Sequence, residues 1–359
     1  MENVADPWQG RRVFLTGHTG FKGGWLSLWL ASRGALIRGY ALDPLTEPNL
    51  FTAASIAGNL DDVRGDTRDY PKLESAMTAF APEVVFHLAA QPLVRRSYAD
   101  PLVTYATNIM GTAHVMEAIR KTPSVRAVVC ITSDKCYQNQ EWVWPYREMD
   151  PLGGYDPYSA SKACAELVVA ASRSSYFPEH RLNEHHVLVA TARAGNVIGG
   201  GDWSEDRLIP DLVRGFQAKR PMLIRQPNAI RPWQHVLEPL HGYMLLAEKL
   251  LAGSADSASS FNFGPGDEEP WPVKRIADKL ATLWGDGAAW KVDSVPEMHE
   301  AHLLRLDSSK ARAELGWRPR LGIDRALEWT LDWYRSWQHG ADMKNVTLTQ
   351  ITSFENVGR

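Results

Sequence analysis

Two short stretches of the sequence contain side chains that could move protons. Asp134 and Lys135 stand side by side in "TSDKCYQN", directly after an apolar run. Downstream, Tyr158 and Lys162 are four residues apart in "YSASK", so they share one face if the segment is helical. An ammonium near a phenol lowers the pKa of the phenol, which makes Tyr158 a candidate base.

The pattern Tyr-x-x-x-Lys is common on solvated helices, so its context decides what it means. Here it follows a glycine-rich loop and a predicted strand over 126–133 that ends at Ser133. Ser133 could hydrogen-bond the same substrate hydroxyl that Tyr158 deprotonates. We therefore predict that Ser133, Tyr158 and Lys162 act together on one hydroxyl group.

The glycine-rich loop "TGHTGFKGGW" places Gly17, Gly20 and Gly23 between a predicted strand and a predicted helix. Glycines let the backbone turn sharply and approach a pyrophosphate, which then lies at the helix N-terminus. The spacing G-x-x-G-x-x-G departs from the general dinucleotide pattern G-x-G-x-x-G. A plain turn would also explain the glycines alone.

Acidic residues after the loop favour a dinucleotide. Asp43 ends the second predicted strand, where a carboxylate can bind ribose hydroxyls and repel a 2′-phosphate, so NAD is favoured over NADP. Asp43 could also be an ordinary turn residue before Pro44, and Asp66 and Thr67 could bind adenine or only cap a loop or helix. The predicted NAD-binding residues are Gly17, Thr19, Gly20, Phe21, Lys22, Gly23, Asp43, Asp66, Thr67, Leu88, Ala89, Ala90, Tyr158 and Lys162.

Short apolar runs alternate with helical patterns through the first 200 residues. Predicted strands cover 12–16, 35–43, 83–90, 126–133 and a run over 186–201 that breaks into a glycine loop. Predicted helices cover 23–34, 69–80, 101–121 and 158–177. Repeated strand–helix units indicate an α/β fold of Rossmann type, with a doubly wound parallel sheet.

The composition and the lengths of the predicted elements change after Gly201, where proline, tryptophan and short elements become frequent. Helices are predicted over 202–221, 236–253 and 267–285, with a short strand and turn over 260–266. In 343–359 we identify no chemistry. We predict that residues 1–200 form mainly the NAD-binding domain. Residues 201–359 form mainly a smaller mixed α/β substrate-binding lobe, with some C-terminal segments returning to the first domain.

Composition excludes several classes of protein. The 359 residues are 44% hydrophobic and carry a formal net charge of −3 with scattered basic residues, which argues against a nucleic-acid partner. Three cysteines without a Cys/His ligand cluster argue against a metal site. No signal-peptide core or membrane span of ~18 apolar residues is found. We expect a cytoplasmic protein without a membrane partner.

The sequence resembles the extended short-chain dehydrogenase/reductase family of sugar-nucleotide enzymes. The resemblance rests on "TGHTGFKG", "HLAAQ", the strand-end serine and "YSASK", and runs from about residue 12 to about residue 319. The strings "TSDKCYQN", "RAGNVIGGGDW", "DRLIPD" and "RPWQHVLEPL" are similar to the CDP-glucose 4,6-dehydratases within that family. These are long, unusual strings and therefore specific.

The resemblance implies one catalytic cycle on tightly held NAD. Tyr158 would take the proton of the glucosyl C4 hydroxyl while C4 gives hydride to NAD. A base would remove the acidified C5 proton, and an acid would protonate the departing C6 hydroxyl. Hydride would then return to C6, and C5 would be reprotonated. Oxidation needs only Ser133, Tyr158 and Lys162, whereas elimination needs the two further groups that Asp134 and Lys135 supply.

The pair at 134 and 135 departs from the dTDP-glucose dehydratases, which have aspartate and glutamate there. Asp134 can serve as the C6 acid only if burial raises its pKa above about 3.9. Lys135 can serve as the C5 base only if its pKa falls from about 10.4 toward neutrality. Both reach the sugar only if the chain leaves strand geometry there. Alternatively, Lys135 binds diphosphate or pairs with Asp134.

The substrate contacts are predicted from polar residues near the later motifs. Arg231 has a guanidinium whose fork suits phosphate, and a matching asparagine in related enzymes places Asn196 at the diphosphate. Some of these arginines could instead form surface ion pairs. The predicted substrate-binding residues are Gln91, Arg95, Arg193, Asn196, Arg207 and Arg231.

Two other functions remain open. A nucleotide-sugar 4-epimerase would need Ser133, Tyr158 and Lys162 but not the pair at 134 and 135. A catalytically inactive dinucleotide-sensing protein would need none of these side chains. The resemblance also implies a homodimer or homotetramer and a role in deoxysugar supply for surface polysaccharide, such as lipopolysaccharide O-antigen.

Overall fold

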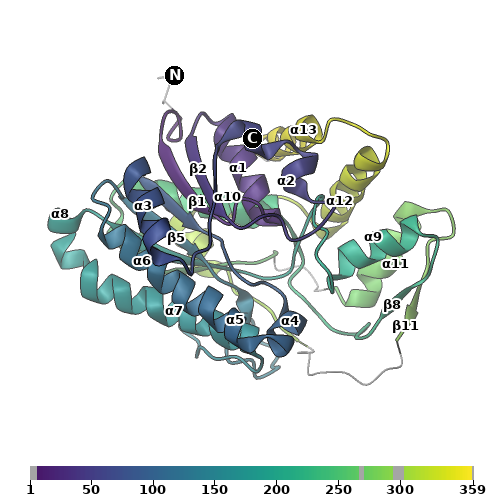
Figure 1. Ribbon diagram of the computed structural model, residues 1–359. Helices are drawn as coiled ribbons and strands as arrows, with labels where there is room; N and C mark the ends of the chain where they lie inside the picture. Colours follow the sequence, from purple (N-terminus) through teal and green to yellow (C-terminus); the bar gives the residue numbers. More distant parts are fainter. Residues whose placement is uncertain (1–5, 267–270, 294–302, 358–359) are drawn as a thin grey trace.

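A seven-stranded parallel sheet forms the centre of the protein (Figure 1). The computed structural model describes residues 6–266, 271–293 and 303–357. The spatial order β10-β6-β5-β4-β1-β2-β3 reverses direction beside β1, as in a doubly wound fold. The strands are β1 (Arg12–Thr16), β2 (Leu36–Ala41), β3 (Asp61–Arg64), β4 (Val84–His87), β5 (Ala127–Ile131), β6 (Leu188–Ala194) and β10 (Ser260–Phe263).

Alternate residues of the central strands enter two separate cores, which is why these strands are apolar throughout. Val13 and Leu15 pack with helices α1 (Phe21–Ser32) and α10 (Leu237–Leu251). Phe14, between them, packs on the opposite face with α3, α6 and α7. Helices therefore cover both faces of the sheet, as predicted. The helices of the second face are α3 (Tyr70–Phe80), α6 (Gly111–Arg120) and α7 (Pro157–Tyr176).

Local capping fixes where α7, the helix that carries Tyr158 and Lys162, begins. Asp156 precedes α7 and accepts a hydrogen bond from the Ser159 backbone N–H (2.9 Å), with Pro157 in the first turn. The long helix expected over 101–121 is continuous but contains a widened π-turn, η2 (Ala106–Met110), between α5 (Pro101–Tyr105) and α6. Such turns are frequent at functional sites.

A smaller lobe lies beside the carboxyl ends of the strands, at the right of Figure 1. There α9 (Leu208–Gln217) and α11 (Val273–Trp284) accompany the parallel pair β8 (Met222–Ile224) and β11 (Trp290–Val292). The helix predicted over 267–285 begins only at Val273, and residues 267–270 lie outside the described residues. A second parallel pair, β7 (Val197–Ile198) and β9 (Gln234–His235), leads into α10.

The remaining elements are short or C-terminal. Two helices near the C-terminus, α12 (Ile323–Gln338) and α13 (Met343–Asn356), pack together, and Trp333 on α12 donates to the Thr347 hydroxyl on α13 (3.0 Å). The others are α2 (Leu50–Ala53), η1 (Ile56–Asn59), α4 (Val94–Ala99), η3 (Asp134–Cys136), η4 (Glu179–Arg181), α8 (Leu182–His185), η5 (Ala255–Ser257) and η6 (Ala311–Leu315).

A buried ion pair joins α7 to the sheet. Glu166 on α7 and Arg193 on β6 are each 2% exposed, and their charged groups lie 2.7 Å apart. Glu166 also accepts hydrogen bonds from Thr132 and, at 2.8 Å, from Thr191. The Tyr137 hydroxyl accepts from Arg193 at 2.9 Å. Buried charges persist only when they are paired and hydrogen-bonded, so this network holds α7, β5 and β6 in one register.

Removal of one partner should leave an uncompensated charge in the core. We expect Arg193→Met to lower the free energy of unfolding by about 3–5 kcal/mol, measured by urea denaturation. The matched control is Arg120→Met, because Arg120 forms an ion pair with Glu117 at 2.7 Å on the surface of α6. A loss for Arg193→Met as small as that for the control would contradict a structural role for the buried pair.

Candidate active site

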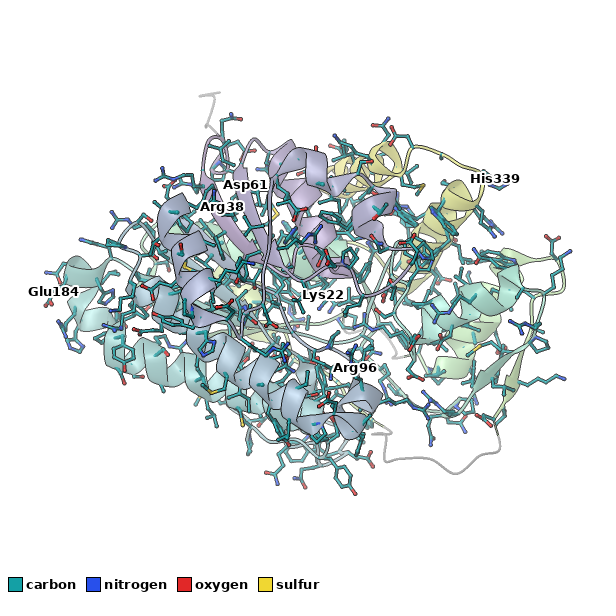
Figure 2. All side chains as sticks on the ribbon, in the orientation of Figure 1. Lys22, Arg38, Asp61, Arg96, Glu184 and His339 are labelled. Atoms are coloured by element: carbon teal, nitrogen blue, oxygen red, sulfur yellow. The ribbon has the colours of Figure 1, made fainter. Side chains whose placement is uncertain are left out.

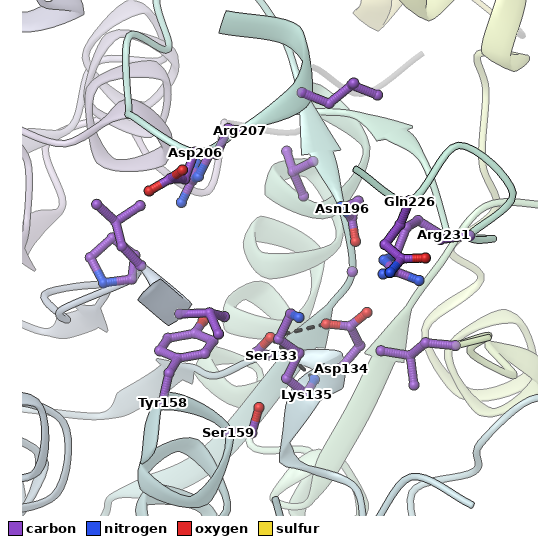
Figure 3. A pocket seen from close by; sticks show the side chains of 18 of the residues that line it. Ser133, Asp134, Lys135, Tyr158, Ser159, Asn196, Asp206, Arg207, Gln226 and Arg231 are labelled. Atoms are coloured by element: carbon purple, nitrogen blue, oxygen red, sulfur yellow. Dashed lines mark hydrogen bonds between the residues drawn. The ribbon is translucent and has the colours of Figure 1, made fainter. Parts of the chain in front are cut away.

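A cavity of about 1180 Å³ opens at the carboxyl ends of the central strands (Figure 3). Its wall includes Lys22 at the start of α1, Ser133 after β5 and Asn196 after β6. The far wall comes from β8 and the end of β11. In doubly wound sheets ligands bind at this edge, where the strand order reverses.

The glycine loop is built as a dinucleotide site requires. Gly17 has a φ of +81°, and a Cβ on Gly23 would lie 2.1 Å from the Gly17 carbonyl oxygen, so the loop packs directly on α1. Gly20 caps α1 without a side-chain hydrogen bond, and the first turn holds no acidic residue. The N-terminal dipole of α1 thus has neither a side-chain cap nor an acidic side chain in its own first turn, which fits a pyrophosphate.

The other predicted NAD residues gather around this loop. Thr19 donates to the Leu42 carbonyl oxygen at 2.9 Å, directly before the exposed Asp43. Asp66 is held by Arg68 at 2.6 Å, and Thr67 is buried beside α6. The Ala89 backbone N–H donates to the Thr16 hydroxyl at 3.1 Å. This hydrogen bond sets the segment 88–90 against the end of β1, beside the glycine loop, and its contact with NAD stays a prediction.

The segment after β5 leaves strand geometry as the catalytic hypothesis requires. Asp134, Lys135 and Cys136 form the single turn η3, capped by Ser133, whose Oγ accepts from the Lys135 backbone N–H at 3.2 Å. Ser133 also donates to Asp134 Oδ1 at 3.0 Å. The side chains of 133, 134 and 135 therefore line one cavity together with Tyr158 (Figure 3).

Tyr158 and Lys162 occupy one face of α7, but their electrostatics differ from expectation. Burial raises the pKa of Tyr158 to about 12, although hydrogen bonding with Ser133 and the charge of Arg207 oppose the rise. Burial also lowers the pKa of Lys162 to about 8, and its ammonium donates to the Ile131 carbonyl oxygen at 3.2 Å. Desolvation thus outweighs the two groups that lower the pKa of Tyr158, and the predicted effect of Lys162 on the phenol stays a prediction.

Asp134 meets the requirement for an acid. Burial raises the pKa of its carboxyl, against the opposing charges of Lys135, Arg231 and Lys22 and the Ser133 hydrogen bond. The side chain is 2% exposed, and Oδ2 has no hydrogen-bond partner within the described parts of the chain. A protonated carboxyl with a bare oxygen in a cavity can donate a proton to a bound hydroxyl.

Cationic and amide side chains also line the cavity. Figure 3 shows Arg207 and Asn196 on its upper side, with Arg231 beside Gln226. Arg207 pairs with the buried Asp202 at 2.9 Å, which orients it. This set of hydrogen-bond donors suits a diphosphate, and binding of that group by these residues stays a prediction.

Asp206 links two more arginines at the cavity edge. Its Oδ1 lies 3.4 Å from Arg95 and 3.5 Å from Arg225, and all three residues line the cavity. Arg95 comes from α4 and Arg225 follows β8, so this contact joins the two sides of the opening. Arg95 thus lines the cavity, and its contact with a substrate stays a prediction.

Two predicted substrate residues lie outside the cavity wall. Arg193 binds Glu166, Tyr137 and a backbone carbonyl, so its guanidinium serves the buried network instead of the substrate. Gln91 uses its side chain within the protein, donating to Thr104 at 2.9 Å and accepting from the Leu93 N–H at 2.7 Å. We correct both assignments to structural roles.

Sequence reasoning missed two residues that position the site. Glu166 follows Lys162 by one helical turn, and that spacing was the available signal. Asn108 lies in the widened turn η2 and bonds both the Gln91 backbone and the Ser161 hydroxyl, the latter at 2.8 Å. No local pattern marks Asn108, because its partners are distant in the sequence.

The fold and the Ser133–Tyr158–Lys162 set define an extended short-chain dehydrogenase/reductase. Residues 13–264 match the model of the NAD dependent epimerase/dehydratase family, and the chain belongs to this family. NAD is accordingly its cofactor. In the parts of the chain that the structure describes, no helix is long and apolar enough to cross a membrane.

Known proteins resemble the chain over nearly its full length. It is 52% identical to a CDP-glucose 4,6-dehydratase of Salmonella typhimurium over 97% of both chains. It is 28% identical to a dTDP-glucose 4,6-dehydratase of Xanthomonas campestris, covering 91% of this chain and 94% of the other. A solved structure described as MoeE5 in complex with UDP-glucose and NAD is 25% identical, with a TM-score of 0.75 over 90% of this chain and 98% of that one.

Lys22 gives a test of the charge in this cavity. Figure 2 places it near the middle of the molecule, where burial and the charges of Arg207 and Lys162 lower its pKa to about 7 from 10.5. Between those values the unfolded chain binds a proton that the folded protein lacks, so stability rises with pH. Relative to Lys22→Met, the wild type should gain about 1–2 kcal/mol of unfolding free energy from pH 7 to pH 9.

Urea denaturation of the protein freed of nucleotide at pH 7, 8 and 9 measures this difference. Lys249 on α10 is exposed, so Lys249→Met is the matched control, which removes an ammonium from the surface instead of from the cavity. A wild-type curve parallel to that of Lys22→Met over this range would show that Lys22 keeps its proton in the folded state.

Proposed function

We propose that this protein converts CDP-glucose to CDP-4-keto-6-deoxyglucose and water. The observation that carries the proposal is the turn η3, which brings Asp134 and Lys135 to the cavity of Tyr158 and Ser133. The 52% identity to a CDP-glucose 4,6-dehydratase over 97% of both chains supports the same activity. An epimerase would have no use for the additional acid and amine.

The protein's own residues supply the proton transfers. The glycine loop and the residues around it would hold NAD. When bound, NAD would supply a hydride acceptor and later a hydride donor, and the positive charge of its oxidised form would favour the phenolate of Tyr158. Tyr158 removes the C4 hydroxyl proton, while Ser133 holds that oxygen. Asp134 protonates the C6 hydroxyl as it leaves, since its pKa is raised and Oδ2 is bare. Lys135 takes the C5 proton, and the resulting ammonium returns a proton to C5 when C6 receives its hydride.

The diphosphate belongs beside the cationic side chains that line the cavity. Arg207 and Arg231 provide charge there, and Asn196 provides an amide that can hydrogen-bond either phosphate. With the diphosphate at these residues, the glucosyl group extends toward η3 and Tyr158, and the base extends toward β8 and β11. The substrate thus spans the two lobes.

Mass spectrometry of the products tests the activity directly. We expect purified protein with NAD to remove one water from CDP-glucose, and not from dTDP-glucose, UDP-glucose or GDP-mannose. Tyr158→Phe should keep binding but lose at least about a hundredfold in turnover, because general base catalysis contributes that much. An unchanged mass with a new chromatographic position would mean epimerisation, and no change with wild type would favour a binding protein.

Two substitutions separate the base role of Lys135 from its charge. We expect Lys135→Met and Lys135→Arg each to lower dehydration at least about a hundredfold, while absorbance of reduced nicotinamide still shows oxidation at C4. Arginine keeps the positive charge but holds its proton, so it cannot act as a base. If Lys135→Arg dehydrates at the wild-type rate, the side chain only binds phosphate or pairs with Asp134.

We also propose that the protein acts as a homodimer or homotetramer. Exposed apolar side chains lie along the helices beside the active site, with Leu102 on α5 and Leu167 on α7 exposed by 77% and 57%. Such residues on neighbouring helices suit an interface between two copies. Size-exclusion chromatography with light scattering would give the copy number, and a monomer at micromolar concentration would contradict the proposal.

The place of the reaction in the cell is a further proposal from family resemblance. A 4-keto-6-deoxy sugar nucleotide is the starting point for deoxysugars of surface polysaccharides such as lipopolysaccharide O-antigen, made in the cytoplasm. Sugar analysis of polysaccharide from cells lacking this protein would test it, and an unchanged deoxysugar content would contradict it.

A further inference from the structure

The end of β3 carries an arginine that the proposed reaction does not use. We propose that Arg64 is a latent ligand for the 2′-phosphate of NADP, and that Asp43 masks it so that the site takes NAD. The inference rests on the placement of the adenosine ribose at Asp43, which belongs to the proposed function. The inference makes Arg64, beside Asp43, a second residue that determines the preference between NAD and NADP.

The guanidinium of Arg64 is fixed on several sides. It lies 2.9 Å from Asp62, donates to the Leu42 carbonyl oxygen at 3.2 Å, and stacks 4.7 Å above the ring of Phe51. Its Nε lies 3.4 Å from the carboxylate of Asp43. A planar group held this way presents its fork in one orientation, as phosphate recognition requires.

This arginine borders the glycine loop. The Leu42 carbonyl that accepts from Arg64 also accepts from Thr19 of the loop, at 2.9 Å. His18, the neighbouring loop residue, lies 2.8 Å from the other oxygen of Asp62. Burial lowers the pKa of His18, and Asp62 opposes the change. Arg64 is thus anchored to the loop that holds the dinucleotide and faces two carboxylates, those of Asp43 and Asp62.

Asp43 acts on Arg64 through its charge more than through a strong bond. Its side chain is 86% exposed, and a separation of 3.4 Å is long for an ionic hydrogen bond. A 2′-phosphate would meet repulsion from this carboxylate before it reached the guanidinium. In Rossmann folds the acid selects NAD and a nearby arginine accepts the phosphate of NADP. Both elements are present in this chain, and the acid has the outer position.

Fluorescence titration with NADH and NADPH tests the proposal without any sugar nucleotide. In full-length protein freed of nucleotide, we expect Asp43→Ala to raise the ratio of NADPH to NADH affinity by at least about tenfold, the size of one charged hydrogen bond. Adding Arg64→Gln should remove most of that gain. Adding Arg64→Lys should keep part of it, because the charge remains and the fork is lost.

The matched control is Arg38→Gln in the Asp43→Ala background. Arg38 is also a sheet arginine that pairs with an aspartate, Asp61, and stacks 4.9 Å from Phe80, but it lies at the other end of β2, where Figure 2 labels the pair. This control should keep the full gain. NADH binding by the double variants that is as tight as that of Asp43→Ala alone shows that the loop is intact.

Two results would overturn the inference. If Asp43→Ala with Arg64→Gln keeps the NADPH gain, Arg64 is not the phosphate ligand. If the wild type binds NADPH as tightly as NADH, Asp43 masks nothing. Neither result bears on CDP-glucose, so the dehydration assay judges the proposed function separately.

Discussion

The buried pair of Glu166 and Arg193 is the interaction on which the geometry of the active site depends. Tyr158, Lys162 and Glu166 follow one another at four-residue spacing along α7, so a carboxylate anchored to the sheet sets the height and rotation of the catalytic side chains. Glu166 also binds Thr132, the residue before Ser133. One carboxylate therefore fixes the helix and the strand end against each other.

Desolvation is the second constraint, and it outweighs attraction between charges at several positions. Burial raises the pKa of Asp134 although Lys135, Arg231 and Lys22 oppose it. It lowers the pKa of Lys162 to about 8 despite the nearby Glu166. A raised pKa makes the carboxyl of Asp134 hold its proton more readily, which is the direction that the proposed acid for C6 requires.

Residues whose roles follow from neighbouring sequence could be predicted, and residues whose roles depend on partners distant in the sequence could not. The buried strands and the glycine loop show their period and spacing in a few residues, and the sheet confirms them. Arg193 was misassigned because its partner Glu166 is 27 residues away and only folding brings the charges together. β3 escaped notice because its edge sequence "DDVR" lacks an apolar run.

The turn η3 shows how elimination chemistry can be added to an oxidation site. In a regular strand, Asp134 and Lys135 would face opposite sides of the sheet, and only one could reach the sugar. β5 ends at Ile131, and the Ser133 hydroxyl accepts from the Lys135 backbone N–H, which caps a single turn in place of further strand. The same hydroxyl donates to Asp134 and hydrogen-bonds Tyr158. Ser133 thus connects Tyr158, the proposed base for oxidation, to Asp134, the proposed acid for elimination. Loss of its hydroxyl would therefore disturb both halves of the proposed reaction.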